Sequence, residues 1–309
     1  MKYLIPSLFV LFALSSCSSR EATPLVHGRV FTERADDLAW ENDVVAFRAY
    51  GPATQQKGER AYGYDIFFKY PGKGLVLETL YGNQCSAENW AKVDSLNKID
   101  WHLGKDFENS FPYHIDHGLG MDCYAVGSTL GAGAPALMQG DSICYSWCYE
   151  SVEILQNGPE RFVARMTFAP RAIGGDTAVV ETRTITLERG AHLNQCEVRY
   201  EGLTQPVEVA TGFPLRDEHP YFTDSEHGII AYSDPTQGSD NGHAMLGAIV
   251  PGGFERVLKA DGHILGIRTL QPGETFEYSF GYAWDKTDIK DFNSWLNYLA
   301  TAATLSNPT

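Results

Sequence analysis

Short runs of β-branched and aromatic residues recur along almost the whole chain, and they constrain its fold more than any other feature. Turn-forming residues separate most of them, as in Asn157-Gly158-Pro159 and Gln271-Pro272-Gly273. Helices do not alternate with these runs, so the βαβ pattern of parallel sheets is not indicated. The sequence therefore predicts an all-β fold, a large antiparallel β-sandwich or barrel. The expected strands cover residues 26–32, 44–50, 64–70, 143–149, 152–155, 161–168, 178–187, 193–200, 207–211, 229–233, 244–250, 264–270 and 275–282.

One clear helix is expected near the C-terminus, where Asp288 can cap it. Its apolar stripe has helical spacing and should pack on the outside of a sheet. A weaker helical pattern covers residues 87–96. Because no internal repeat or later linker is evident, residues 24–309 are expected to form a single domain. The stripe consists of Ile289, Phe292, Trp295, Leu296, Leu299 and Ala303.

The N-terminal segment has the pattern of an export signal. Lys2 precedes an apolar run over residues 4–14, which is too short to span a bilayer. The run ends at Leu14-Ser15-Ser16-Cys17, the form of a bacterial lipobox. We therefore expect a signal peptide at 1–16, lipid on Cys17 and a tether at 17–23. The protein would be exported and anchored in the periplasm or outer membrane. An ordinary secretory signal or a short anchor is the alternative.

Charge and cysteine content narrow the classes of partner. The formal net charge is −15, which argues against nucleic acid as a partner because nucleic-acid binding needs a basic surface. An acidic sugar could still bind through a few local Arg or Lys residues, or a metal. Besides Cys17, five cysteines remain. Five is an odd number, so at least one thiol stays unpaired within the chain, and buried free thiols are expected.

The segment at 33–52 is the first candidate site. A polar loop rich in acids is expected to lead into the strand at 44–50. An indole can pack on a sugar ring, while carboxylates and amides bond its hydroxyls. The alternative is a charged surface loop with one buried tryptophan. The candidate binding residues here are Arg34, Asp37, Trp40, Glu41, Asn42 and Arg48, to which we add Arg29 on the preceding strand.

The segment at 113–124 is the second candidate site. Two glycines and the absence of periodicity place it in a loop that holds two imidazoles, two carboxylates and two phenols. Imidazole can move a proton near neutral pH, and with carboxylates it can also bind a metal. A loop ordered only by His–Asp hydrogen bonds is the alternative. The candidate catalytic residues are Tyr113, His114, Asp116, His117 and Tyr124, with Asp122 as a binding residue.

Four sequence blocks, taken in order, resemble one family. They are ERADDLAWENDVVAFRAYGPA at 33–53, YHIDHGLGMDCYAVGSTLGAGAPAL at 113–137, NGPERFVARMTF at 157–168 and TITLERGAHLNQCEV at 184–198. The family is an exported one, common in Bacteroidetes and classed as a domain of unknown function. It is similar to the galactose-mutarotase-like group. The resemblance implies a β-supersandwich and work on pectin or other uronate-rich glycans of plants or algae.

These patterns favour an enzyme that moves a proton on a uronate-containing sugar. In a lyase, His114, His117, Tyr113 or Tyr124 would transfer the proton. The carboxylate would be held by Arg29, Arg34, Arg48 or Asn42. A mutarotase or epimerase would need only an acid and a base across the ring oxygen, with Glu41 as one candidate base. The sequence is also compatible with a glycoside hydrolase and with a glycan-binding lipoprotein that has no catalytic activity. No cofactor is required, although calcium or zinc is compatible with these residues.

Overall fold

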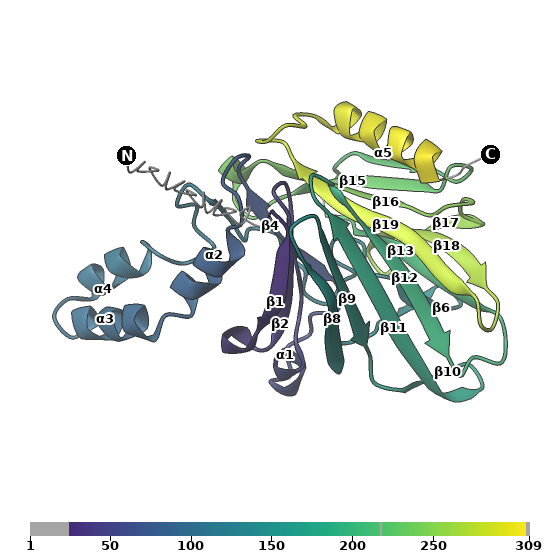
Figure 1. Cartoon of the computed structure of the whole chain (residues 1–309), viewed down its shortest axis with the longest axis horizontal. Helices are drawn as coiled ribbons and strands as arrows, with labels where there is room; N and C mark the ends of the chain where they lie inside the picture. The colour runs from purple at the N-terminus through teal and green to yellow at the C-terminus, as the bar shows by residue number, and fades with distance from the viewer. Residues whose placement is uncertain (1–24, 217, 307–309) are drawn as a thin grey trace, which may run out of the picture.

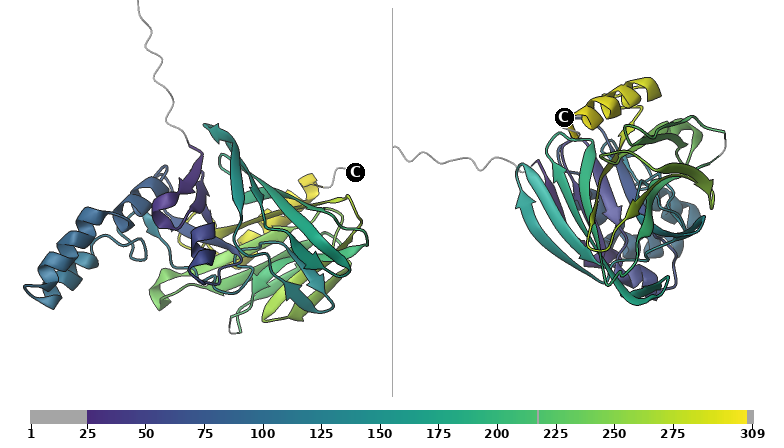
Figure 2. Two further views of the ribbon diagram at one scale, coloured as in Figure 1. Left: turned by 90° about the horizontal axis from the view of Figure 1, so that it is seen from below. Right: turned by 90° about the vertical axis from the view of Figure 1, so that its right-hand side faces the viewer.

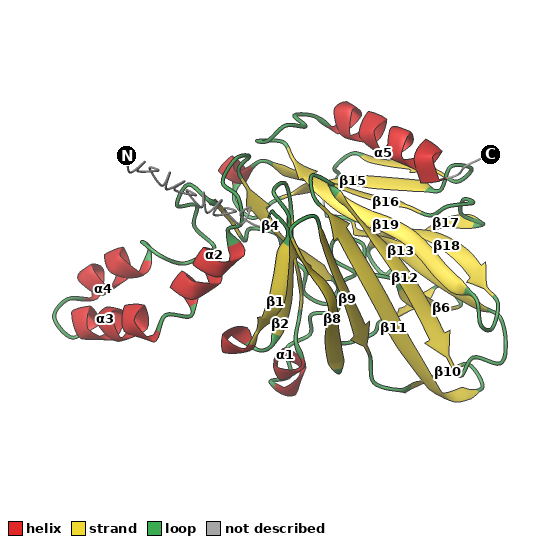
Figure 3. Cartoon of the chain, viewed as in Figure 1, coloured by secondary structure: helices red, strands yellow, loops and turns green. Residues whose placement is uncertain are grey.

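Antiparallel strands form three sheets in residues 25–216 and 218–306, which the computed structural model describes (Figures 1 and 3). The first sheet has five strands in chain order: β1 (His27–Phe31), β2 (Asp37–Glu41), β3 (Ala46–Ala49), β4 (Tyr64–Lys69) and β5 (Gly120–Met121). The second has nine, in the order β14-β15-β16-β19-β12-β11-β9-β8 with β10 beside β11. The third has the order β17-β18-β13-β6-β7. The predicted antiparallel sandwich is confirmed.

The remaining strands and helices have the following bounds. The strands are β6 (Ala136–Gln139), β7 (Ser142–Cys144), β8 (Ser151–Gly158), β9 (Arg161–Thr167), β10 (Arg171–Ile173), β11 (Asp176–Glu188), β12 (Leu193–Glu201), β13 (Val207–Pro214), β14 (Tyr221–Asp224), β15 (Ile229–Pro235), β16 (His243–Ile249), β17 (Arg256–Ala260), β18 (His263–Leu270) and β19 (Thr275–Trp284). The helices are α1 (Pro52–Gln56), α2 (Leu77–Gln84), α3 (Ala87–Asn97), α4 (Trp101–Glu108) and α5 (Phe292–Ser306), with 3-10 turns at Thr32–Arg34 and Ser239–Asn241.

One large core lies where the sheets meet. It joins Trp40 and Phe47 of the first sheet to Phe162 and Phe280 of the second and Phe213 of the third. The strands alternate as their sequences predict, since side chains two apart on a strand point to the same face. On β11, for example, the inward positions are buried from residue 179 to residue 187. Cys123, Cys148 and Cys196 are buried free thiols, as expected.

The stretch predicted as a polar loop before Val44 contains a buried strand. All five residues of β2 are buried, and β2 is paired on both sides, with β1 and with β3. The strand has an acid at each end, Asp37 and Glu41, and these two charges made the sequence look like that of an exposed loop. Each is compensated by a distant basic side chain, so the charges do not need solvent.

The C-terminal helix α5 covers one end of the nine-stranded sheet (Figure 1). Trp295 and Leu299 pack over Gly247 on β16, where an added Cβ would lie 2.7 Å from Leu299. The helix starts later than predicted. Asp291 caps it by accepting the Ser294 N–H at 2.9 Å, whereas Asp288 lies 3.0 Å from His192 Nε2.

A helical arm, α3 and α4, projects from the sandwich between β4 and β5 in the chain (Figure 2). The helix α3 confirms the weaker pattern at 87–96, and Ser86 caps it by accepting the Asn89 N–H. The helix α4 was not predicted. Ile99, Trp101 and Leu103 are exposed at the end of the arm. None of the described helices is long and apolar enough to cross a membrane.

The carboxylate of Glu41 binds the start of α2 to the first sheet. One carboxylate oxygen lies 2.5 Å from Lys69 Nζ on β4, and the carboxylate also accepts the backbone N–H groups of Val76 and Leu77, the latter at 2.7 Å. The first N–H groups of a helix have no partner inside the helix, so the carboxylate completes the start of α2. The expectation that Glu41 contacts sugar or acts as a base is wrong, because it is buried in this structural role.

Glu41→Gln should lower the free energy of unfolding by about 3 kcal/mol, because it leaves the Lys69 ammonium buried without a counter-charge. Glu33→Gln is the matched control. Glu33 pairs with Arg29 on the surface, and its loss should cost less than ~1 kcal/mol. Urea denaturation of the three proteins measures both values. Equal, small losses would contradict the role given to Glu41.

Candidate functional site

Arg48 is the centre of a buried polar cluster on the outer face of the first sheet. It lies directly across from Asp65 in the β3–β4 pairing, and its Nε donates to Asp65 Oδ2 at 3.0 Å. Its Nη2 donates to Asp122 Oδ2 at 2.9 Å, and its Nη1 lies 3.8 Å from Asp37 Oδ2. The three carboxylates come from β2, from β4 and from the residue after β5. The guanidinium therefore joins three separate parts of the chain.

Two phenols complete the cluster. Tyr113 Oη accepts from Arg48 Nη1 at 3.3 Å and from Arg34 Nε at 3.2 Å. Tyr50 donates to Asp65 Oδ2 at 2.6 Å and accepts from Arg48 Nη2. Tyr113 is buried, whereas Tyr50 and Arg34 are half-buried. The cluster therefore reaches the surface at Tyr50 and Arg34.

The cluster holds more carboxyl groups than cations. Asp37, Asp65 and Asp122 face Arg34 and Arg48, so full ionisation would leave one negative charge without a partner in a buried space. Burial raises the pKa of Asp122 to about 7, against the attraction of Arg48. Burial also raises the pKa of Asp37. Groups with such perturbed pKa values are concentrated at functional sites.

His114 connects this cluster to solvent. Its Nδ1 lies 3.1 Å from the backbone carbonyl of Asp122 and 3.8 Å from Asp122 Oδ2, and its side chain is 58% exposed. A carbonyl can only accept, so Nδ1 carries the hydrogen and Nε2 carries the lone pair. Partial burial, aided by the positive charge of Arg48, lowers the pKa of His114. The imidazole is thus neutral at pH 7 and suited to accept a proton at Nε2.

The loop that presents His114 is held by Asp116. The Asp116 carboxylate accepts the backbone N–H of Gly118 at 2.8 Å, that of Gly120 at 3.3 Å, and the Tyr70 hydroxyl at 2.7 Å. The backbone of Gly120 has φ +119, a conformation that favours glycine. Asp116 therefore orders the loop, and the structure gives it a positioning contact in place of the expected catalytic one.

The structure brings together half of the residues predicted from the two segments, and it leaves the others outside. The guanidinium of Arg48 contacts Asp37, Tyr113 and Asp122 directly. Arg34 joins them through Tyr113, and His114 joins them through Asp122. Arg29 instead pairs with Glu33 at 2.7 Å and Glu78 at 2.6 Å. His117 is exposed on the same loop as His114.

Two further predicted contacts with sugar are wrong. Trp40 is completely buried in the core, and its Nε1 donates to Asn194 Oδ1 at 2.8 Å. Asn42 is also buried, where it accepts the N–H groups of Val44 and Val45 and turns the chain between β2 and β3. Both side chains are used by the fold.

The Tyr124 hydroxyl makes no hydrogen bond to the Arg48 cluster. Its buried hydroxyl has no hydrogen-bond partner in the described part of the chain, and the Arg216 guanidinium stands 5.2 Å from its ring centre. Asp234 nearby is fully buried, and burial raises its pKa to about 7. Tyr124 is not accessible for the proton transfer expected of it.

Asp65 and Tyr50 are the site residues that sequence reasoning missed. Asp65 is the second residue of the strand YDIFFK, and its position two residues before Phe67 places it on the face of the sheet that bears Arg48. A carboxylate next to the apolar run Ile66-Phe67-Phe68 was the available signal. Tyr50 was seen only as part of a strand.

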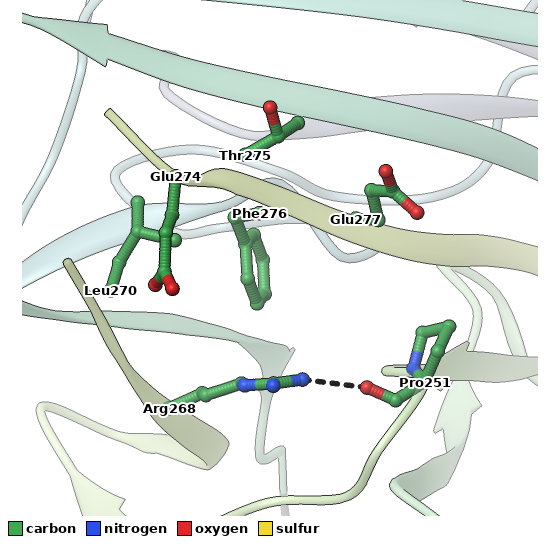
Figure 4. Close-up of a pocket in the computed structure, with 7 residues that line it drawn as sticks. All are labelled: Pro251, Arg268, Leu270, Glu274, Thr275, Phe276 and Glu277. Atoms are coloured by element: carbon green, nitrogen blue, oxygen red, sulfur yellow. Dashed lines mark hydrogen bonds between the residues drawn. The ribbon is translucent and has the colours of Figure 1, made fainter. Parts of the chain in front are cut away.

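Other features of the surface do not join this cluster. A cavity of about 340 Å³ lies between the ends of β16 and β18 and the start of β19 (Figure 4). Its Arg268 donates to the Pro251 carbonyl at 2.6 Å, and none of the predicted site residues lines it. Among the described residues, no three His, Cys, Asp or Glu side chains are grouped to hold a metal ion.

Comparison with known proteins gives one family and a few partial likenesses. The family described as "Domain of unknown function (DUF4861)" matches residues 15–309. A relative from Formosa agariphila, "Uncharacterized protein P7", is 29% identical over 216 residues, which is 69% of this chain and 49% of the relative. The chain thus spans about half the length of that relative.

Two solved glycosidases align with part of this chain. A quadruple mutant of the alpha-N-acetylgalactosaminidase NagBb from Bifidobacterium bifidum aligns at 15% identity with a TM-score of 0.32, over 54% of this chain and 33% of that chain. The GH36 alpha-galactosidase AgaB from Geobacillus stearothermophilus aligns at 12% identity with a TM-score of 0.36, over 83% and 41%.

Asp122→Asn should change how stability depends on pH. The folded pKa of Asp122, about 7, lies above the ordinary aspartate value of 3.8, so the folded state retains a proton that the unfolded state releases. The contribution of Asp122 is complete below pH ~4 and is lost as pH rises towards ~7, on the order of 1 kcal/mol per pH unit. The stability of the Asp122→Asn variant should not fall in this way as pH rises, because its amide side chain does not titrate.

Denaturant melts of wild type and variant between those pH values measure the difference. Asp106→Asn, a change at an exposed carboxylate on α4, is the control and should follow wild type. Parallel pH curves for wild type and Asp122→Asn would show that Asp122 is ionised throughout.

Proposed function

The chain belongs to the DUF4861 family, and from that premise we propose that it is a carbohydrate-active enzyme that abstracts a proton from a uronate-containing sugar, with His114 as the base. The observation that carries the proposal is the contact between His114 Nδ1 and the Asp122 carbonyl. It orients the ring and leaves the Nε2 lone pair on a side chain that solvent reaches.

Arg34 is the best candidate to bind the uronate carboxylate. Arg48 is saturated by the aspartates and tyrosines of the cluster, and Arg29 by two glutamates. Among the described residues, the side-chain hydrogen bond of Arg34 uses only Nε, which leaves its two terminal nitrogens for a ligand. Arg34 is half-buried, and its charge contributes to lowering the pKa of His114. Guanidinium and carboxylate can pair through two parallel bonds.

The reaction proposed is β-elimination. His114 takes the proton α to the uronate carboxyl, and that electron pair forms a double bond as the bond to the 4-linked oxygen breaks. The leaving oxygen takes a proton from solvent. Arg34 would stabilise the negative charge that develops on the carboxyl group. The Arg48 cluster holds His114 and Arg34 in place through Asp122 and Tyr113.

Export and lipid anchoring are part of the same proposal. Support comes from the signal pattern at 1–16 and the small residues before Cys17, which lie outside the described residues. An enzyme for plant or algal polysaccharides must meet its substrate outside the cytoplasm. The lipid anchor would keep it in the periplasm or outer membrane.

His114→Ala should lower turnover by roughly 10²–10⁴-fold, the usual contribution of a general base. The fold should remain intact, because the side chain is exposed. Time-resolved proton NMR with pectin and alginate oligosaccharides detects the reaction as a new vinyl proton. His227→Ala, which removes an exposed imidazole paired with Asp224, is the control and should retain activity.

The same spectra separate this reaction from the remaining candidates. New reducing ends without a vinyl proton would indicate a hydrolase, and faster anomer exchange alone would indicate a mutarotase. Full activity in His114→Ala with loss in His117→Ala would move the base to His117. No change with any sugar by the wild-type protein would contradict the proposal and favour a binding lipoprotein.

A further inference from the structure

A second cavity lies beside the segment that joins β7 to β8. Its volume is about 200 Å³, below the roughly 300–1,000 Å³ of sites for drug-sized ligands, so its size suits a single ring. Neither candidate segment of the sequence contributes to its lining. Its principal lining residues are Gln55, Tyr145, Trp147, Phe168, Pro170 and Arg171.

The aromatic side of this cavity is held in a fixed orientation. Trp147 is partly exposed, and its Nε1 donates to the Glu59 carbonyl at 3.2 Å. Tyr62 stacks on Tyr145 at a centroid distance of 4.8 Å and meets Trp147 edge-on at 5.9 Å. Rigid aromatic faces of this kind provide contact area at low cost in side-chain entropy, and they suit the apolar face of a sugar ring.

One guanidinium, that of Arg171, lines the polar side of the cavity. Arg171 and the buried Arg183 both bond the buried carboxylate of Glu181, at 2.9 and 2.5 Å. Arg171 also donates to the Cys144 carbonyl and remains 20% exposed at the cavity. Two guanidiniums thus face one carboxylate, which is the opposite balance from the Arg48 cluster. Among the residues that line the cavity, only Arg171 is charged, and in a chain of net charge −15 a cationic lining favours an anionic ligand.

Tyr50 links this cavity to the candidate active site. Its hydroxyl bonds Asp65 and Arg48, and the residue also lines a narrow space of about 10 Å³ together with Trp147, which lines the larger cavity as well. The narrow space therefore borders one residue of the Arg48 cluster, Tyr50, and one residue of the larger cavity, Trp147.

We infer that the Trp147 cavity is a uronate-binding subsite, which holds a sugar ring of the same oligosaccharide whose reacting ring lies at His114. This inference rests on the proposed function. Trp147 would pack against the ring, and Arg171 would attract its carboxylate. The subsite would be occupied by longer oligosaccharides and left empty by a monosaccharide.

The test measures binding, so that turnover does not enter the readout. Calorimetry gives dissociation constants for galacturonate, mannuronate and their short and long oligosaccharides. The parent protein is His114→Ala, which cannot turn the sugars over. The two double variants carry Trp147→Ala or Trp147→Leu in addition. Long oligosaccharides should bind roughly tenfold more weakly to both double variants, which is about 1.4 kcal/mol, while monosaccharide binding stays unchanged. Trp147→Leu retains apolar volume and guards against a folding defect. Trp101→Ala, at the exposed end of the arm, is the control.

Carboxyl-reduced oligosaccharides of the same length test the charge. They should bind more weakly than the acids to the parent protein. Arg171→Gln should reduce that preference, while the part that depends on Arg34 should stay. Unchanged affinity for long acids in both Trp147 variants, equal losses for monosaccharides and long acids, or no binding of any acid by the parent protein would each overturn the subsite. If the protein binds long acids through Trp147 but wild type releases no product, the subsite stands and the proposed reaction fails.

Discussion

The buried guanidinium of Arg48 is the interaction on which the candidate site depends. A charge removed from water is tolerated only when surrounding groups compensate it, and breaking such a set by removing one partner is costly. Arg48 meets this condition with Asp37 from β2, Asp65 from β4 and Asp122 after β5, so it ties the arrangement of the first sheet to the loop that follows the helical arm. The need to compensate one cation thereby places the loop that carries His114.

The excess of carboxylate over guanidinium gives the cluster its chemical character. An ion network with balanced charge would be inert, whereas a surplus acid in a buried space must share or keep a proton. Asp122 takes this position, and its backbone carbonyl also sets the tautomer of His114. The second ionic cluster, at Glu181, has the opposite balance, with two arginines on one carboxylate. The proposed binding of an acidic sugar chain rests on these two clusters, with the base His114 beside one and the cation Arg171 at the other.

Local patterns predicted the strands, the C-terminal helix and the family, and most of the residues around Arg48 were identified by residue type alone. What failed were inferences that required long-range partners. Asp37 and Glu41 made β2 resemble a loop, because their counter-charges, Arg48 and Lys69, come from the strands β3 and β4 of the same sheet. Trp40 was assigned to the surface for the same reason. Burial of a charge depends on which segments meet, and periodicity within one segment does not contain that information.

The central claim is that the Asp122 carbonyl holds His114 with its proton on Nδ1, so that Nε2 is a base at neutral pH. Long-range ¹H–¹⁵N NMR of the imidazole tests it most directly, because the two ring nitrogens of each tautomer have different shifts. We expect a protonated Nδ1 and an unprotonated Nε2 at pH 7, with a pKa of His114 below that of an ordinary histidine. A proton on Nε2, or a doubly protonated ring at pH 7, would contradict it.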